Sequence, residues 1–159
     1  MNKLLHLLET SARLTNKELA VMLGKTEQEI ADEIRLYEES GVIKGYKAII
    51  DKEKAHYETV SALIEIKVQP KYGRGFDDIA GRIASLEEVE SIYLMSGGFD
   101  LMVMVTDKSF HEVAMFIANR VSPLEGVVST ATHFILKRYK EQGVLFADDF
   151  KDDRGTISL

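Results

Sequence analysis

Apolar positions in the first fifty residues follow the 3.6-residue period of a helix. A first helix is predicted over residues 2–11 by three leucines on one helical face, Leu4, Leu7 and Leu8. Two more helices are predicted to start at Thr15 and Thr26, because each threonine precedes by three residues the glutamate of a capping box. Gly24 and Gly41 are predicted to end them. This layout indicates a helix-turn-helix, and it also fits an ordinary small helical bundle.

The period of the apolar pattern changes after this segment. Residues 42–50 read VIKGYKAII and predict a hairpin or wing. Residues 51–59 are polar without a clear period, which is typical of a linker. From Val60 to Val68 apolar and polar residues alternate, which predicts a half-buried strand that ends before Pro70.

The second half continues with two helical stripes and three further strands. The first stripe contains Phe76, Ile79, Ala80 and Ile83, and the second contains Phe110, Val113, Ala114 and Ile117. A hairpin at residues 90–105 separates them, and a long strand is predicted over residues 126–139. The order strand, helix, strand, strand, helix, strand predicts a ferredoxin-like antiparallel sheet with both helices on one face.

The predicted fold class is therefore α+β, with two domains. A winged helix-turn-helix occupies residues 1–50, and a linker follows at 51–59. The ferredoxin-like β-α-β-β-α-β domain covers residues 60–139. The remaining residues, 140–159, form an acidic tail containing Asp148, Asp149, Asp152 and Asp153.

The hairpin at residues 90–105 carries the most distinctive chemistry. Its two apolar runs flank Ser96-Gly97-Gly98, and Asp100 stands at the head of a strand that is otherwise apolar. A structural explanation is that Asp100 accepts hydrogen bonds from the local turn amides. A functional explanation is that the carboxylate meets a ligand cation, and the hairpin alone leaves both open.

Composition limits the classes of function. The chain has 159 residues, no cysteine and a net charge of −6, which argues against simple electrostatic attraction to nucleic acid. No apolar run approaches the roughly 18–20 residues of a membrane span, so a cytoplasmic protein without membrane association is expected. Metal-ligand spacing is missing from the four histidines, and no nucleophile-and-base pair is evident. We therefore predict no enzyme activity, catalytic residue, metal site or cofactor.

Four stretches in this order resemble the Lrp/AsnC (leucine-responsive and asparagine-responsive) transcriptional regulators: ARLTNKELAVMLG, YEESGVIKGYKAIID, SGGFDLMV and GVVSTATHFIL. The resemblance covers about residues 3–139, and the second half resembles the amino-acid-sensing RAM domain of that family. It implies a regulator of transcription that binds double-stranded DNA and responds to a small amino-acid effector. It also implies a homodimer formed through the sheets, with further assembly to an octamer.

The resemblance places an effector site at the Gly-rich turn. The residues it implies are Met95, Gly97, Gly98, Asp100, Thr130 and Thr132, of which the two threonines match a Thr-x-Thr pattern of the family. The chemistry is consistent, because consecutive turn amides can hold a carboxylate and Asp100 can receive an ammonium group. Such a site would recognise an amino acid without catalysing a reaction.

On the DNA side, the candidate contacts lie in and around the third predicted helix: Lys25, Thr26, Gln28, Asp32, Arg35, Lys44 and Lys47. The helix departs from the family, which usually has basic residues where this chain has Asp32 and Glu33. Arg35 is the one cation on the outward face of this helix, although an acid can also read cytosine. The alternative is therefore an effector-binding co-regulator with weak or no sequence-specific DNA binding.

Overall fold

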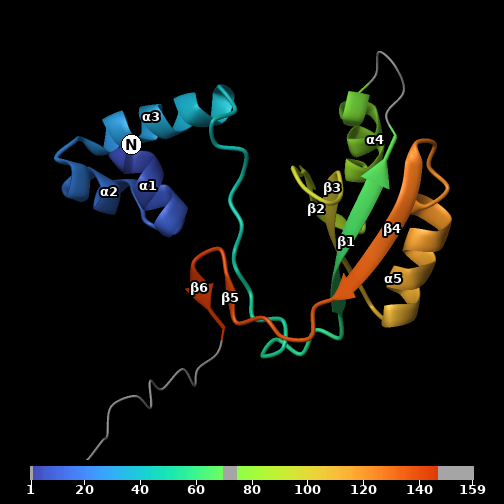
Figure 1. Cartoon of the computed structure of the whole chain (residues 1–159). Coiled ribbons are helices and arrows are strands. Elements are labelled where there is room, and N and C mark those ends of the chain that lie inside the picture. Colours follow the sequence, from blue (N-terminus) through green and yellow to red (C-terminus); the bar gives the residue numbers. More distant parts are fainter. Residues whose placement is uncertain (1, 70–74, 147–159) are drawn as a thin grey trace, which may run out of the picture. The chain divides into compact units, whose positions relative to one another are not determined.

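The computed structural model describes residues 2–69 and 75–146, and it divides into two compact units, Met1–Ile49 and Ile50–Leu159 (Figure 1). The first unit contains three helices: α1 (Lys3–Thr10), α2 (Asn16–Leu23) and α3 (Glu27–Glu39). Their apolar faces meet in a small core of Leu4, Leu19, Ala20 and Ile30. The three predicted helices are thus confirmed.

Local hydrogen bonds explain where these helices begin. Thr15 and Thr26 each accept the main-chain N–H of the glutamate three residues later, and each glutamate side chain returns a bond to the threonine main chain. Both predicted capping boxes are therefore complete. Gly24 ends α2 in the left-handed conformation, as predicted.

The predicted wing at residues 42–50 is wrong, because no strand forms there in the described chain. The N–H of Ile43 donates to the carbonyl of Tyr37, and the Tyr46 hydroxyl donates to Glu38, so this segment follows the end of α3. Its apolar side chains, including Val42 and Tyr46, remain exposed. An isolated two-stranded hairpin is marginal in water, and here no third strand supports one.

The second unit is built on a four-stranded antiparallel sheet. Its elements are β1 (Val60–Val68), α4 (Gly75–Ala84), β2 (Val89–Leu94), β3 (Leu101–Asp107), α5 (Phe110–Phe116), a π-helical turn η1 (Ile117–Val121) and β4 (Val127–Phe134). The strand order β2-β3-β1-β4 confirms the predicted ferredoxin-like topology. Side chains of β1 and β3, such as Ile64 and Val103, are buried with Ile83 of α4 and Val113 of α5. Both helices therefore cover the same face.

The opposite sheet face carries side chains that alternate with the buried ones. Leu63 is paired with Met104, and Met102 with Tyr93, so these four apolar residues lie on the face away from the helices. Tyr93 is exposed, and the others are partly exposed. This open face is the surface on which we expected a second copy of the chain to pack.

The structure differs from the sequence predictions in the segment before β1 and in the segment after β4. The last long strand ends at Phe134 rather than at residue 139, and two short strands follow, β5 (Lys140–Glu141) and β6 (Val144–Leu145). The first part of the predicted tail is therefore a small hairpin, while residues 147–159 with the four aspartates lie outside the described residues. The predicted linker folds with the second unit, where Lys52 Nζ lies 3.0 Å from Glu90 Oε1. Within the described ranges every helix is too short or too polar to cross a membrane.

Candidate functional site

The outward face of α3 carries the polar residues expected from helical projection. Gln28, Asp32, Arg35 and Glu39 are all exposed. Asp32 links two of them, since its carboxylate accepts a hydrogen bond from Gln28 Nε2 at 3.1 Å and an ion-pair bond from Arg35 at 2.8 Å. The negative charge of Asp32 is thus matched locally by the cation expected to contact DNA.

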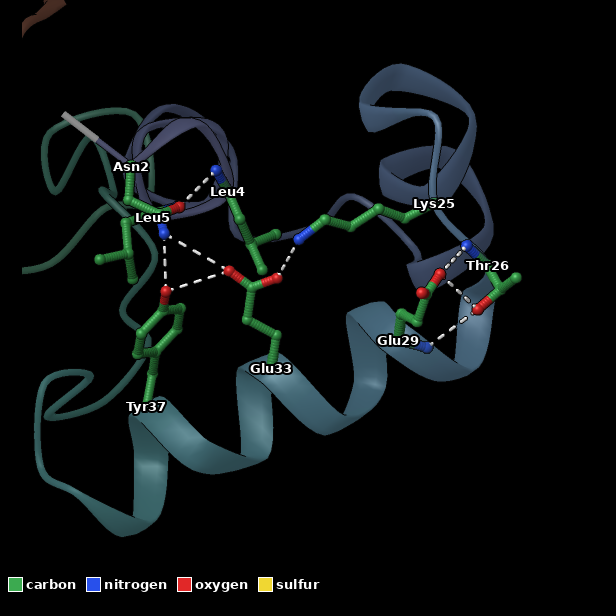
Figure 2. A network of polar contacts seen from close by, with 8 residues as sticks. All are labelled: Asn2, Leu4, Leu5, Lys25, Thr26, Glu29, Glu33 and Tyr37. Atoms are coloured by element: carbon green, nitrogen blue, oxygen red, sulfur yellow. Dashed lines mark hydrogen bonds and ion pairs between the residues drawn. The ribbon is translucent and has the colours of Figure 1, made fainter.

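The second acid of α3 belongs to a polar network inside the first unit. Glu33 forms an ion pair with Lys25, and its Oε1 accepts the Tyr37 hydroxyl at 3.0 Å (Figure 2). Asn2, the N-cap of α1, donates to the Tyr37 hydroxyl at 2.6 Å and lies 3.4 Å from the same Glu33 oxygen. The network therefore joins α1, the α2–α3 turn and α3.

Charge pairing in this network shifts the pKa of its members. The hydrogen bond from Lys25 lowers the pKa of the Glu33 carboxyl, and partial burial opposes that shift. The same bond raises the pKa of Lys25, and the bond to Glu33 raises the pKa of the Tyr37 hydroxyl. Each shift favours the form that keeps the network intact at neutral pH.

These contacts change the roles expected from sequence. Lys25 was predicted to reach the DNA backbone, but here its ammonium group is bound to Glu33. The hydroxyl of Thr26 is used in the capping box, where it accepts the Glu29 N–H and donates to Glu29. Lys44 and Lys47 are exposed, as a role in contacting phosphate requires. Asn2 and Tyr37 were not predicted as members of this network. Tyr37 follows Glu33 by four residues on α3, a spacing that could have indicated the contact, whereas Asn2 is 31 residues from Glu33 and carried no local signal.

The Gly-rich turn is closed by its own main chain and tied to a neighbouring strand. The N–H of Met95 donates to the carbonyl of Asp100 at 2.8 Å, and Asp100 N–H donates to Ile66 at 3.0 Å. The side chain of Asp100 then accepts the N–H of Val68 through Oδ2 at 2.8 Å. The structural explanation predicted that Asp100 accepts hydrogen bonds from the amides of its own turn. In the structure its side chain accepts instead from an amide of β1.

Both turn glycines are exposed, and nothing lies within 4 Å of the place where a Cβ would stand on either. Gly97 has a φ of 153°, which side-chain-bearing residues rarely adopt. The turn therefore offers open space and main-chain amides beside a partly buried carboxylate, a combination able to receive a zwitterion.

The two predicted threonines lie elsewhere on the sheet. Thr130 is paired with Ile66 and Thr132 with Ile64, so both share the helix-covered face with those core residues. Ile66 also pairs with Leu101 on its other side. Thr130 therefore lies two strands from Leu101, a separation of about 10 Å. Within one chain the threonines and the turn are not brought into contact.

Comparison with known proteins identifies the family. The family described as the Lrp/AsnC ligand binding domain matches residues 61–145. A protein of Bacillus subtilis named as an uncharacterized HTH-type transcriptional regulator, YugG, is 42% identical over 157 residues, which cover 98% of this chain and 95% of that protein. The chain belongs to the Lrp/AsnC family. It is a helix-turn-helix transcriptional regulator, and the family is regulatory rather than enzymatic.

Solved structures share the fold of this Lrp/AsnC regulator. Escherichia coli AsnC superposes with a TM-score of 0.66 at 21% identity, covering 87% of this chain and 91% of AsnC. A transcriptional regulator from Neisseria meningitidis, solved as an L-Met complex, superposes with a TM-score of 0.71 at 21% identity. That likeness covers 89% of this chain and 93% of the Neisseria chain.

Proposed function

We propose that this regulator binds double-stranded DNA through α3 as a homo-oligomer in the cytoplasm, and that a small amino acid bound at the turn of residues 95–100 controls it. The observation that carries the effector proposal is the placement of Asp100. Its carboxylate uses Oδ2 on Val68, and within the described chain no hydrogen bond occupies its second oxygen. The L-Met complex of the Neisseria regulator supports an amino acid as the class of effector.

The chemistry of the turn accounts for selection of an amino acid. The ammonium group would pair with the carboxylate of Asp100, and the main-chain N–H groups at Gly97 and Gly98 would hold the ligand carboxylate. Exposed Met95 at the turn would contact the effector side chain. A neutral small molecule lacks both charges and would bind more weakly.

The separation between the turn and the threonines supports a site shared between chains. Thr130 lies two strand spacings from Leu101 beside the turn, and Thr132 lies two residues further along β4, so both would contribute to an effector bound at another copy. Packing of the open sheet faces around Leu63 and Met104 would form the homodimer, and dimers would assemble further to an octamer. A two-fold arrangement is the common way to cover such a surface.

The pairing of acids with cations supports DNA binding over the co-regulator alternative. Asp32 is matched by Arg35 and Glu33 by Lys25, so neither acid is an isolated negative charge facing phosphate. Lys44 and Lys47 would contact the DNA backbone on the side of the third helix. Thr26 and Gln28 lie at its start, where a recognition helix meets the base edges.

Selection of genomic fragments by the purified full chain tests both parts together. We expect a limited set of duplexes to be enriched, and we expect a pool of amino acids to change the enrichment. A mock selection without protein is the control. Enrichment that ignores every amino acid would contradict the effector proposal, and no enrichment under any condition would favour the co-regulator.

A further inference from the structure

The outward face of α3 carries two hydrogen-bonding side chains held by one carboxylate. Gln28 Nε2 donates to one oxygen of Asp32, and Arg35 donates to the other. The three residues follow the i, i+4, i+7 spacing of one helical face, and all are exposed. They form a continuous polar row that ends in a glutamine and an arginine, the two side chains that most often identify adenine and guanine.

Asp32 determines which end of the Gln28 amide faces outward. An ionised carboxylate accepts hydrogen bonds and donates none, so it binds the amide nitrogen and turns the carbonyl oxygen away. The carbonyl oxygen and the second N–H of Gln28 then remain for another partner. This donor–acceptor pair matches N6 and N7 of adenine in the major groove.

The same carboxylate orients Arg35. One terminal nitrogen of the guanidinium is bound to Asp32 at 2.8 Å, and the planar group has further N–H donors in fixed directions. Two of these can reach O6 and N7 of guanine together. Gln28 and Arg35 are seven residues apart, which is about 10.5 Å along a helix. That length corresponds to about three base pairs, since successive bases are roughly 3.4 Å apart.

We propose that Asp32 is a positioning residue that sets Gln28 to read an adenine and Arg35 to read a guanine about three base pairs away. The proposal rests on the proposed function, because it requires α3 to lie in the major groove. Asp32, which stands where the family usually has a basic residue, would thereby determine which bases the helix prefers.

Stability and base reading are separable at this position. The side chains of Arg35 and Asp32 are 66% and 51% exposed, and ion pairs this exposed contribute little to folding. Removal of the Asp32 charge therefore leaves the first unit folded. On entry into the groove, water is displaced from the row, and the orientation of the two side chains then decides which bases are satisfied.

The test measures discrimination between bases rather than affinity alone. A duplex selected by the wild-type protein is compared with all its single-base variants for wild type, Asp32→Asn, Gln28→Ala, Arg35→Ala and Glu39→Gln. Gln28→Ala and Arg35→Ala should each remove the preference at one position, an adenine and a guanine about three base pairs apart. Asp32→Asn should reduce both preferences by about fivefold or more. An asparagine amide can donate to Gln28 and allow it to flip, and its neutral oxygen holds Arg35 through a weaker bond than the carboxylate does.

Glu39→Gln is the matched control. Glu39 lies on the same outward face, and no bond joins it to Gln28 or Arg35 in the described chain. Glu39→Gln and Asp32→Asn each remove one negative charge, so both variants should bind a random duplex at least as well as wild type. Glu39→Gln should also keep both base preferences.

Two outcomes overturn the inference in distinguishable ways. If wild type selects a duplex and Asp32→Asn keeps both preferences, Asp32 does not position the readers, and the proposed function stands. If wild type selects no duplex, the proposed DNA binding fails, and the inference fails with it.

Discussion

Asp100 and Val68 join two strands at the end of the sheet, where the Oδ2 atom of the Asp100 side chain accepts the Val68 main-chain N–H at 2.8 Å. Asp100 immediately precedes β3, and Val68 is the last residue of β1. The carboxylate therefore closes the β1–β3 pair beyond its ladder and remains beside an exposed Gly-rich turn. This arrangement allows structural and ligand-binding roles to be separated by substitution.

Replacement of Asp100 by asparagine should preserve the strand contact and remove the charge. The asparagine oxygen can still accept the Val68 N–H, so we expect little change in the unfolding temperature. Affinity for an amino-acid effector should fall about tenfold or more, because a charge-assisted hydrogen bond to the ammonium is lost. Calorimetric titration of both proteins with the twenty amino acids provides the measurement.

Asp100→Ala is the companion variant, because it removes both the charge and the strand contact. It leaves the Val68 N–H without its acceptor, which should cost about 1–3 kcal/mol of unfolding free energy. Equal effector affinity in wild type and Asp100→Asn would show that the carboxylate has a structural role only.

Arg35→Ala should weaken binding to a selected duplex by about 1–3 kcal/mol. The variant loses a cation that contacts DNA and also leaves Asp32 without its ion-pair partner. Fluorescence anisotropy at several salt concentrations measures both affinity and salt slope. Lys17→Ala, in α2, is the control for loss of a single positive charge. Retention of full affinity and slope by Arg35→Ala would exclude the assignment of α3 as the recognition helix.

Acid should weaken the first unit through Glu33. Its pKa is lowered in the folded state, mainly by the bond from Lys25, so the stabilisation is present above the unfolded pKa of about 4.3 and is lost as pH falls through the folded value. Glu33→Gln removes this titration. Thermal unfolding followed by circular dichroism from neutral pH to about pH 3 should show a smaller loss for Glu33→Gln than for wild type. Parallel curves for the two proteins would contradict the prediction.

The open sheet face should mediate self-association. Met104→Glu places a charge beside Leu63, and burial of that charge at a two-fold interface is unfavourable. Light scattering at micromolar concentration should show a dimer or larger assembly for wild type and a smaller species for the variant. Leu36→Glu is the control, because Leu36 is an exposed apolar residue of α3 in the other unit. A monomeric wild type would rule out the interface.

Gly126→Ala should destabilise the second unit by about 1–3 kcal/mol. Gly126 has a φ of 94°, and an added Cβ would lie 2.6 Å from Ile79 Cδ1 and 3.2 Å from the Gln69 carbonyl oxygen. Gly81→Ala in α4 is the matched control, since nothing lies within 4 Å of its Cβ position. An alanine there should stabilise the helix by about 0.5–1 kcal/mol. Thermal unfolding should show a lower unfolding temperature for Gly126→Ala and a higher one for Gly81→Ala than for wild type.

Elements of this protein that depend on neighbours in sequence could be predicted from the sequence alone. The capping boxes at Thr15 and Thr26 act over three residues, and the alternation over residues 60–68 reflects the two faces of one strand. Because these signals are local, the helices, the order of helices and strands along the chain, and the outward face of α3 followed from them. The prediction of a wing was wrong because a strand also needs a partner strand, which no local sequence pattern supplies.

Only the tertiary structure decided which distant groups meet. Glu33 lies beside Lys25 and Asn2 because three helices pack together, and Asp100 meets Val68 because β1 and β3 pair in one register. Register also put Thr130 on the helix-covered face, away from the turn. A shift of one residue reverses the face of every side chain in a strand, so the placements of Asp100 and Thr130 depend on how the strands pair in the folded sheet.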